Sequence, residues 1–220
     1  MAEPVLLDND VVLKACAYQS HAEALARTTI DELPPGILKI ARYTLQAVIA
    51  RASNLVDRES AARALDIFLN EAMLLEPSDG EIELAADLEE RAAAASLEFD
   101  TGESQLVAIM ISRGCPLLVT GDKRAIIALS GILLAEAHGR VACFEQFMML
   151  LTAMIPHDEL RRRVCSEPGA DKAIANCFSC SAPAIGLEDI LNGLLSYSEH
   201  LRGASGEVLI ADDRLLAIVS

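Results

Sequence analysis

The chain has 220 residues, which is long enough for one domain of ordinary size with an extension. Hydrophobic residues make up 52%, but there are only 5 Phe, 3 Tyr and no Trp, so an aliphatic core is expected. The longest apolar runs, 125–135 and 146–156, fall short of the ~18 residues that span a bilayer, which argues against a membrane protein. The net charge of −15 argues against tight, nonspecific binding of nucleic acid.

Apolar periodicity and turn residues predict an alternation of strands and helices. The expected strands lie at 5–8, 73–75, 116–120 and 140–144. The expected helices lie at 11–18, 37–52, 59–71, 81–96, 102–113 and 123–137. The helix over 37–52 is opened by Pro34-Pro35-Gly36. Strands separated by helices favour a mainly parallel sheet covered on both faces. The predicted fold class is therefore α/β, a three-layer α/β/α sandwich.

The character of the chain changes after residue 145. A helix predicted at 146–155 is interrupted by Pro156, and another amphipathic helix is predicted at 188–201. We therefore divide the chain into residues 1–150, which carry the α/β pattern, and residues 151–220, a mostly helical extension.

The six cysteines show no evident disulfide framework, and this favours a reducing cytoplasm. No basic stretch precedes an apolar segment near the N-terminus, so no secretory signal is expected. Cys177 and Cys180 have the spacing of zinc ligands, together with Cys165 and His157 farther off, but only one such pair exists. A buried thiol pair in a helix turn is the preferred interpretation of Cys177 and Cys180.

Carboxylates stand directly after two predicted strands and at the start of one predicted helix. Asp8 and Asp10 follow the first strand, Asp122 follows a later one, and Asp100 and Glu103 begin a helix. Open α/β sheets bind ligands at the carboxyl ends of their strands. Several carboxylates at one point are costly unless a cation or shared protons compensate them. The pattern therefore predicts a divalent metal site.

The same acids also have a simpler interpretation as helix caps. Asp8 could cap the helix that follows it, and Asp10 also stands where a helix N-cap belongs. Asp122 precedes a predicted helix directly. Asp100 and Glu103 have the spacing of a capping box. Thr120, just before Asp122, could orient a carboxylate or bind a metal-bound water. Capping and metal binding remain alternative interpretations at this point.

Three blocks of sequence occur in the order seen in a known family. They are Leu-Leu-Asp8-Asn-Asp10-Val-Val-Leu, then Asp100-Thr-Gly-Glu103-Ser-Gln-Leu-Val-Ala-Ile, then Arg-Gly114-Cys-Pro116-Leu-Leu-Val-Thr120-Gly-Asp122. Together they resemble the PIN-domain nucleases, which include the toxin ribonucleases of bacterial toxin–antitoxin pairs. The resemblance covers residues 1 to about 150, and its last block is the most specific.

The resemblance implies a metal-dependent endoribonuclease, which would use Mg²⁺ or Mn²⁺ to hydrolyse a phosphodiester bond of RNA. Hard oxygen ligands suit these cations. The implied catalytic metal ligands are Asp8, Glu103 and Asp122, and the supporting ligands are Asp10 and Asp100.

Three cations adjoin these blocks, namely Lys14, Lys123 and Arg124. They are candidates for steering the phosphate backbone of RNA, although solvation at the surface explains them equally well. A toxin-type enzyme further implies an antitoxin or another protein partner, and association with a second copy of the chain is open.

The middle of the chain departs from the family pattern. The family usually supplies another acid from a helix between the first two blocks, but residues 33–56 contain no Asp or Glu. The helix expected there presents Lys39, Arg42 and Tyr43 instead. Arg42 could reach the carboxylates and replace the charge of the metal. The alternative function is therefore a catalytically inactive PIN-fold module for binding or assembly, with the C-terminal helices as its contact surface.

Overall fold

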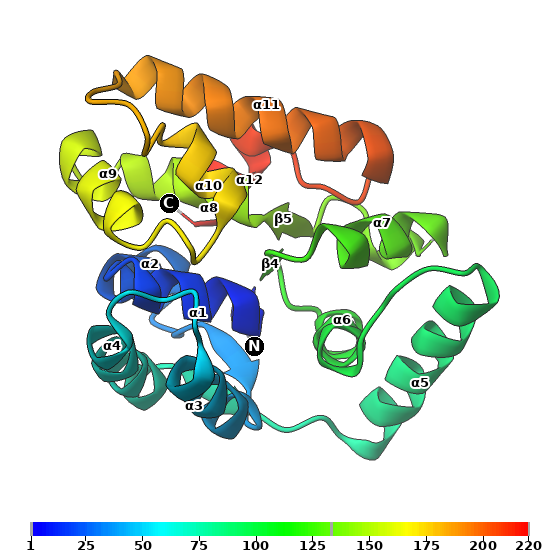
Figure 1. Cartoon of the computed structure of the whole chain (residues 1–220). Coiled ribbons are helices and arrows are strands. Elements are labelled where there is room, and N and C mark those ends of the chain that lie inside the picture. Colours follow the sequence, from blue (N-terminus) through cyan, green and yellow to red (C-terminus); the bar gives the residue numbers. More distant parts are fainter. Residues whose placement is uncertain (1, 133, 220) are drawn as a thin grey trace.

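The computed structural model describes residues 2–132 and 134–219 (Figure 1). Five strands form one sheet in which all neighbours are parallel, in the order β3-β2-β1-β4-β5. The strands are β1 (Leu6–Leu7), β2 (Gly36–Leu38), β3 (Met73–Leu75), β4 (Leu118–Thr120) and β5 (Val141–Cys143). The predicted α/β class with a parallel sheet is confirmed.

Helices precede or follow every strand. They are α1 (Asn9–Ala17), α2 (His21–Thr28), α3 (Ala41–Arg51), α4 (Arg58–Glu71), α5 (Asp79–Ala94), α6 (Thr101–Arg113), α7 (Lys123–Gly131), α8 (Phe144–Thr152), α9 (His157–Ser166), α10 (Lys172–Cys177), α11 (Leu187–Ser205) and α12 (Asp212–Ile218). The predicted helix at 123–137 is shorter than expected, because α7 ends at Gly131 and a separate 3₁₀ turn, η1, spans Ala135–Ala137. Residue 133 of that prediction lies outside the described residues.

The three layers follow from the alternation of side chains along each strand. Residues on one face of the sheet pack under α1, α2, α3, α4 and α8, and they are Leu7, Ile37, Leu74, Val119 and Ala142. Residues on the other face pack under α5, α6 and α7, and they are Leu6, Leu38, Leu75, Leu118 and Val141. Both faces are buried, as a parallel sheet requires. The molecule is therefore a three-layer α/β/α sandwich.

The strand β2 corrects the prediction of a helix over 37–52. Its residues Gly36–Leu38 lie between β1 and β3, and the helix α3 begins only at Ala41. A Cβ at Gly36 would lie 2.6 Å from a side-chain carbon of Leu75, so glycine allows the two strands to pack closely there. Ile37 packs into the hydrophobic cluster on one face of the sheet and Leu38 into the cluster on the other face. In a segment of only three residues, the sequence pattern of such a strand cannot be told from that of the first turn of a helix.

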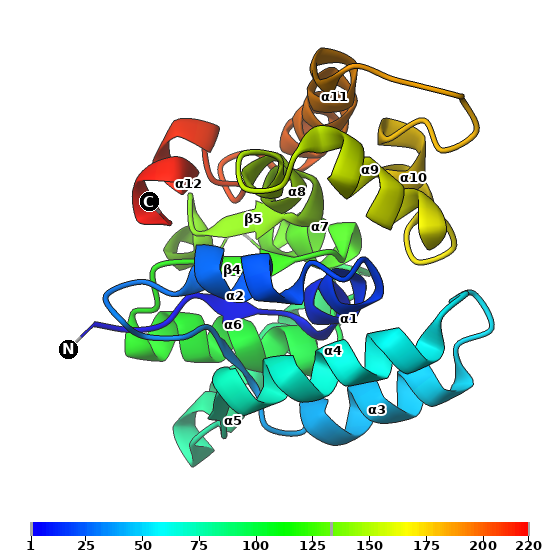
Figure 2. The same cartoon turned by 90° about the vertical axis from the view of Figure 1, so that its left-hand side faces the viewer.

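The segment from residue 151 onward is helical, as expected, and it shares the core of the sheet. Its helices α9–α12 gather at the β5 end of the sheet, whereas α3, α4 and α5 lie toward the β3 end (Figures 1 and 2). Ile174, Phe178, Ile190 and Leu194 are fully buried in the same cluster as the strands and α1. The chain returns to the sheet at Leu209, which forms a parallel bridge with Val141.

The cysteines differ from the prediction. Cys165 and Cys180 form a disulfide whose Cα atoms are 5.1 Å apart, while Cys177 is a buried free thiol. The expected thiol pair of Cys177 and Cys180 is therefore wrong, because Cys180 turns to α9 rather than to its sequence neighbour. A cytoplasmic location consequently has less support from the cysteines than the sequence indicated. In the described parts of the chain, every helix is too short or too polar to cross a lipid bilayer.

Candidate functional site

A large cleft lies where β1 and β4 end. The first three strands build one half of the sheet outward from β1, and the chain then returns to add β4 and β5 on the other side of β1. Ligands of open α/β sheets bind at such a reversal. The cleft has a volume of about 1090 Å³. All of the site residues expected from the sequence line it, namely Asp8, Asp10, Lys14, Asp100, Glu103, Asp122, Lys123 and Arg124.

Asp8 follows β1 directly and is buried at the base of the cleft. Its Oδ1 accepts a hydrogen bond of 2.6 Å from the amide of Asn9, and its Oδ2 accepts one of 3.1 Å from the hydroxyl of Thr120. Burial, with a further contribution from the charge of Asp10, raises the pKa of Asp8 to about 6. Thr120 orients a carboxylate, as predicted. Asp8 rather than Asp10 is the N-cap of α1, so the predicted capping role of Asp10 is wrong.

Glu103 and Asp100 form a capping box at the start of α6. The amide of Glu103 donates to Asp100 Oδ1 at 2.9 Å, and the amide of Asp100 donates to Glu103 Oε2 at 3.1 Å. The capping interpretation of this pair is therefore confirmed. Glu103 is nevertheless buried, and its desolvation raises its pKa to about 8 despite that hydrogen bond.

A second capping box, in α5, shows that a capping box alone does not raise the pKa of its glutamate. Ser78 and Glu81 make the same pair of hydrogen bonds, and Glu81 is also buried. The guanidinium of Arg113 lies 2.7 Å from Glu81 and holds the pKa of that carboxyl at about 2. Glu103 has no such cation among its described contacts. It faces Asp100, Asp122 and Asp8 instead, all of which raise its pKa.

Asp122 behaves mainly as a cap and an ion-pair partner. Its Oδ1 accepts from the amide of Arg124 at 2.7 Å, and its Oδ2 lies 2.8 Å from Nη2 of the same residue. Burial tends to raise the pKa of Asp122, but the hydrogen bonds and the charge of Arg124 outweigh it, and the pKa is lowered. Arg124 therefore stabilises the ionised form of Asp122. The Thr120 hydroxyl accepts from the Asp122 amide at 3.1 Å and so links this residue to Asp8.

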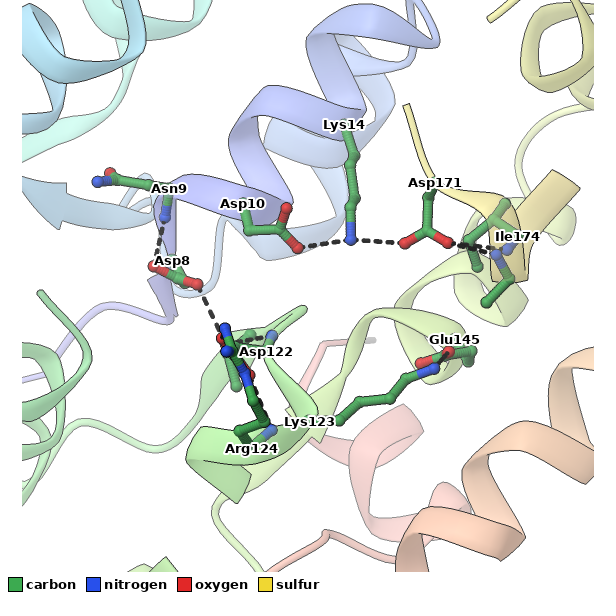
Figure 3. Close-up of polar contacts among 12 residues, drawn as sticks. Asp8, Asn9, Asp10, Lys14, Asp122, Lys123, Arg124, Glu145, Asp171 and Ile174 are labelled. Atoms are coloured by element: carbon green, nitrogen blue, oxygen red, sulfur yellow. Dashed lines mark hydrogen bonds and ion pairs between the residues drawn. The ribbon is translucent and has the colours of Figure 1, made fainter. Parts of the chain in front are cut away.

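Lys14 is buried between two acids (Figure 3). Its Nζ lies 2.5 Å from Asp10 Oδ2 and 2.5 Å from Asp171 Oδ2. Asp171 comes from the N-terminus of α10, in the extension, and no sequence pattern indicates its proximity to Lys14. Lys123 is paired similarly, because its Nζ lies 2.5 Å from the buried Glu145. Arg124 alone of the three expected steering cations has a largely exposed side chain.

The wall of the cleft near α3 carries no charge. It is lined by Leu38, Ile40 and Thr44. Lys39 points away and forms an ion pair of 2.6 Å with Glu76, and Arg42 is not among the described residues that line the cleft. The hypothesis that Arg42 neutralises the carboxylates is therefore not supported by the geometry.

Three carboxylates of the cleft lack an ion-pair partner among the described residues, namely the buried Asp8 and Glu103 and the exposed Asp100. Over residues 2–132 and 134–219, no group of three or more His, Cys, Asp or Glu side chains is arranged to hold a metal ion. Asp10 and Asp122 are engaged in ion pairs with Lys14 and Arg124. The predicted convergence on one cleft is found, but the roles of these residues stay predictions.

Comparison with known proteins gives no further guidance. No protein-family model, curated protein or solved structure matches this chain. The relation to the PIN-domain nucleases therefore stays an interpretation of the sequence blocks.

Proposed function

We propose that the protein is a PIN-like, metal-dependent phosphodiesterase that cleaves RNA, with Asp8 and Glu103 at its centre. The observation that carries this proposal is a pair of buried carboxylates, both with raised pKa values, at the reversal point of a parallel sheet. The matched capping glutamate Glu81 has an arginine partner, and Glu103 has none in the described structure. A structural role alone does not account for that difference.

The donor set fits a hard divalent cation. Asp8 and Glu103 offer carboxylate oxygens, and Glu103 Oε1 is not used by the capping box. Mg²⁺ is commonly held by one or two carboxylates, with water and substrate phosphate completing its shell, so three converging acids are not required. When bound, such an ion supplies positive charge against the attacked phosphate and makes water more acidic.

The residues of the chain supply position and charge around that centre. Thr120 fixes one oxygen of Asp8, and the amide of Asp100 fixes one oxygen of Glu103. Arg124 lies at the exposed side of the cleft, where its guanidinium can exchange its contact with Glu98 for a phosphate oxygen. The uncharged wall of Leu38, Ile40 and Thr44 leaves room for sugar and base. Cytoplasmic location and an antitoxin or a second copy as partner belong to the same proposal.

One observation favours the alternative of an inactive binding or assembly module. Lys14 and Arg124 already form ion pairs with Asp10, Asp171 and Asp122 without any metal. Residues 33–56, which lack acids, contribute only the uncharged wall described above. The two functions differ in whether Asp8 and Glu103 bind a divalent ion, so metal binding decides between them.

The test is calorimetric titration of the full chain with Mn²⁺ in two buffers of different ionisation enthalpy. Because the pKa of Glu103 is raised to about 8, metal binding near neutral pH should release a proton and tighten as the pH rises. Asp8→Asn and Glu103→Gln should abolish both the binding and the metal-dependent cleavage of a labelled oligoribonucleotide. Glu81→Gln, at the equivalent capping position of α5, should leave both unchanged. Absence of Mn²⁺ binding by the wild type would establish the inactive module instead.

A further inference from the structure

Lys14 is a cation held by two carboxylates, Asp10 and Asp171, that line the proposed metal centre. Its ammonium group sits between Asp10 Oδ2 and Asp171 Oδ2, at 2.5 Å from each (Figure 3). Only 9% of its side chain is exposed, and Nζ lies 5.0 Å from the centre of the Phe144 ring. Burial tends to lower the pKa of Lys14, but the two carboxylates outweigh it, so Lys14 remains a cation.

The backbone of the cleft is shaped around this arrangement. A Cβ added at Gly121 would lie 1.9 Å from Asp10 Oδ2 and 3.1 Å from Lys14 Nζ. The turn after β4 therefore accepts no side chain at this position unless Asp10 and Lys14 move. The close approach of this turn leaves the carboxylate of Asp10 directed at Lys14 (Figure 3).

The charges divide the cleft into two parts. Asp10, Lys14 and Asp171 together carry one negative charge, whereas Asp8 and Glu103 have no cation among their described contacts. A divalent ion that used Asp10 as a ligand would have to approach the ammonium of Lys14 or displace it, and like charges repel. Two-metal phosphodiesterases need ligands for two ions that lie close together. Lys14 already occupies Asp10 and Asp171, the acids that a second ion would need.

We propose that Lys14 is a built-in substitute for the second metal ion, so that the centre binds a single divalent cation at Asp8 and Glu103. This inference rests on the proposed function. It removes Asp10 from the metal ligands and Lys14 from the substrate contacts that the sequence suggested. It also assigns a role to Asp171, which holds the ammonium from the side of the extension.

The experiment measures the number of Mn²⁺ ions bound per chain, by calorimetry and by equilibrium dialysis. The wild type should bind one ion. Lys14→Met, which removes the charge but keeps the length of the side chain, should bind two. Lys123→Met is the matched control, because Lys123 also lies 2.5 Å from a buried acid and 4.8 Å from an aromatic ring centre. This control should still bind one ion.

Each outcome has a distinct meaning. Two ions on the wild type, or one ion on a folded Lys14→Met variant, would overturn the role of Lys14 and leave the proposed function standing. No ion on the wild type would overturn the proposed function itself. Asp10→Asn keeps the proposal testable even if Lys14→Met does not fold. It should still bind one ion, and loss of that ion would show that Asp10 is a metal ligand after all.

Discussion

Glu81 and Glu103 occupy the same position in two capping boxes, but their carboxyl groups are held in opposite states. Arg113 keeps Glu81 ionised, whereas the surroundings of Glu103 favour its protonated form. A site built to bind a cation has this property before the cation arrives, because its acids must lack a partner from the protein. Candidate ligands of a cation are thus identified by the absence of a positively charged partner as well as by their position.

The pH dependence of stability follows from the raised pKa of Asp8. The pKa in the folded protein, about 6, lies above the usual 3.8, so the folded state binds this proton more tightly than the unfolded state does. Its contribution to stability is complete below the usual pKa and is lost as the pH rises through 6. The shift corresponds to roughly 3 kcal/mol in all.

We therefore expect metal-free wild type to lose stability between about pH 5 and about pH 8, by ~1 kcal/mol more than Asp8→Asn does. The Glu103→Gln variant should also lose less stability than wild type over this pH range, since the pKa of Glu103 is about 8. Urea unfolding with a chelator present measures this, and the difference between proteins cancels His21, whose lowered pKa acts in the opposite direction. Identical pH profiles for wild type and Asp8→Asn would contradict the burial of a strained acid here.

At the residue scale, the local part of the site was predictable and the distant part was not. Asp8, Thr120 and Asp122 stand beside strand ends, so their place at the sheet edge follows from sequence. The contact of Lys14 with Asp171 joins α1 to α10, and the sequence around Asp171 indicates only a helix cap. The disulfide of Cys165 and Cys180 is similar, because cysteine connectivity cannot be derived from sequence alone.

At the element scale, the start of α6 couples helix stability to the site. Asp100→Ala removes the side-chain cap, which should cost about 1 kcal/mol of stability and loosen the turn that holds Glu103. Mn²⁺ affinity should fall with it. Ser78→Ala in the capping box of α5 should cost a similar amount of stability and leave Mn²⁺ affinity unchanged.

Thermal melting and Mn²⁺ titration of the two variants provide the measurement. Asp100→Asn separates the contributions, since asparagine caps nearly as well without the charge. It should restore stability, and any remaining loss of affinity would then come from the charge of Asp100. Equal Mn²⁺ affinities for wild type and Asp100→Ala would show that α6 does not position the ligand.

The elements were predictable where several turns of helix or clear turn residues define them. The helices α4, α5 and α6 begin and end within two residues of their predicted bounds, because long periodic patterns are unambiguous. The strand β2 was mistaken for a helix, since its three residues are set by neighbours on both sides. The apolar side chain of Ile82 is 48% exposed, because the buried face of α5 follows Glu81, Ala85, Leu88 and Ala92.

At the scale of the whole molecule, the extension is part of the fold. Phe178, Ile190 and Leu194 are fully buried against the core of the sheet, and α11 also packs along α7 and α8. A fragment of residues 1–150 should therefore lose cooperative melting and bind a hydrophobic dye, because that core face becomes exposed. Calorimetry and dye fluorescence measure both.

The control for this fragment is the full chain cleaved once in the loop 181–186, between α10 and α11. Both pieces remain present, so the cleaved protein should still melt in one transition. A cooperative transition of the 1–150 fragment near the melting temperature of the intact chain would instead show that the extension is a separate unit.

The bridge between Val141 and Leu209 also affects whether two copies of the protein can associate through the edges of their sheets. The amide of Ile210 donates to the carbonyl of Val141 at 2.7 Å, so the outer edge of β5 already has a partner from its own chain. At the opposite edge, β3 spans only Met73–Leu75 and is followed by Glu76 and Pro77, which lacks an amide donor. Neither edge strand offers a long stretch of unpaired backbone to which a strand from another molecule could add. Addition of a strand from another molecule is therefore disfavoured at both edges of the sheet.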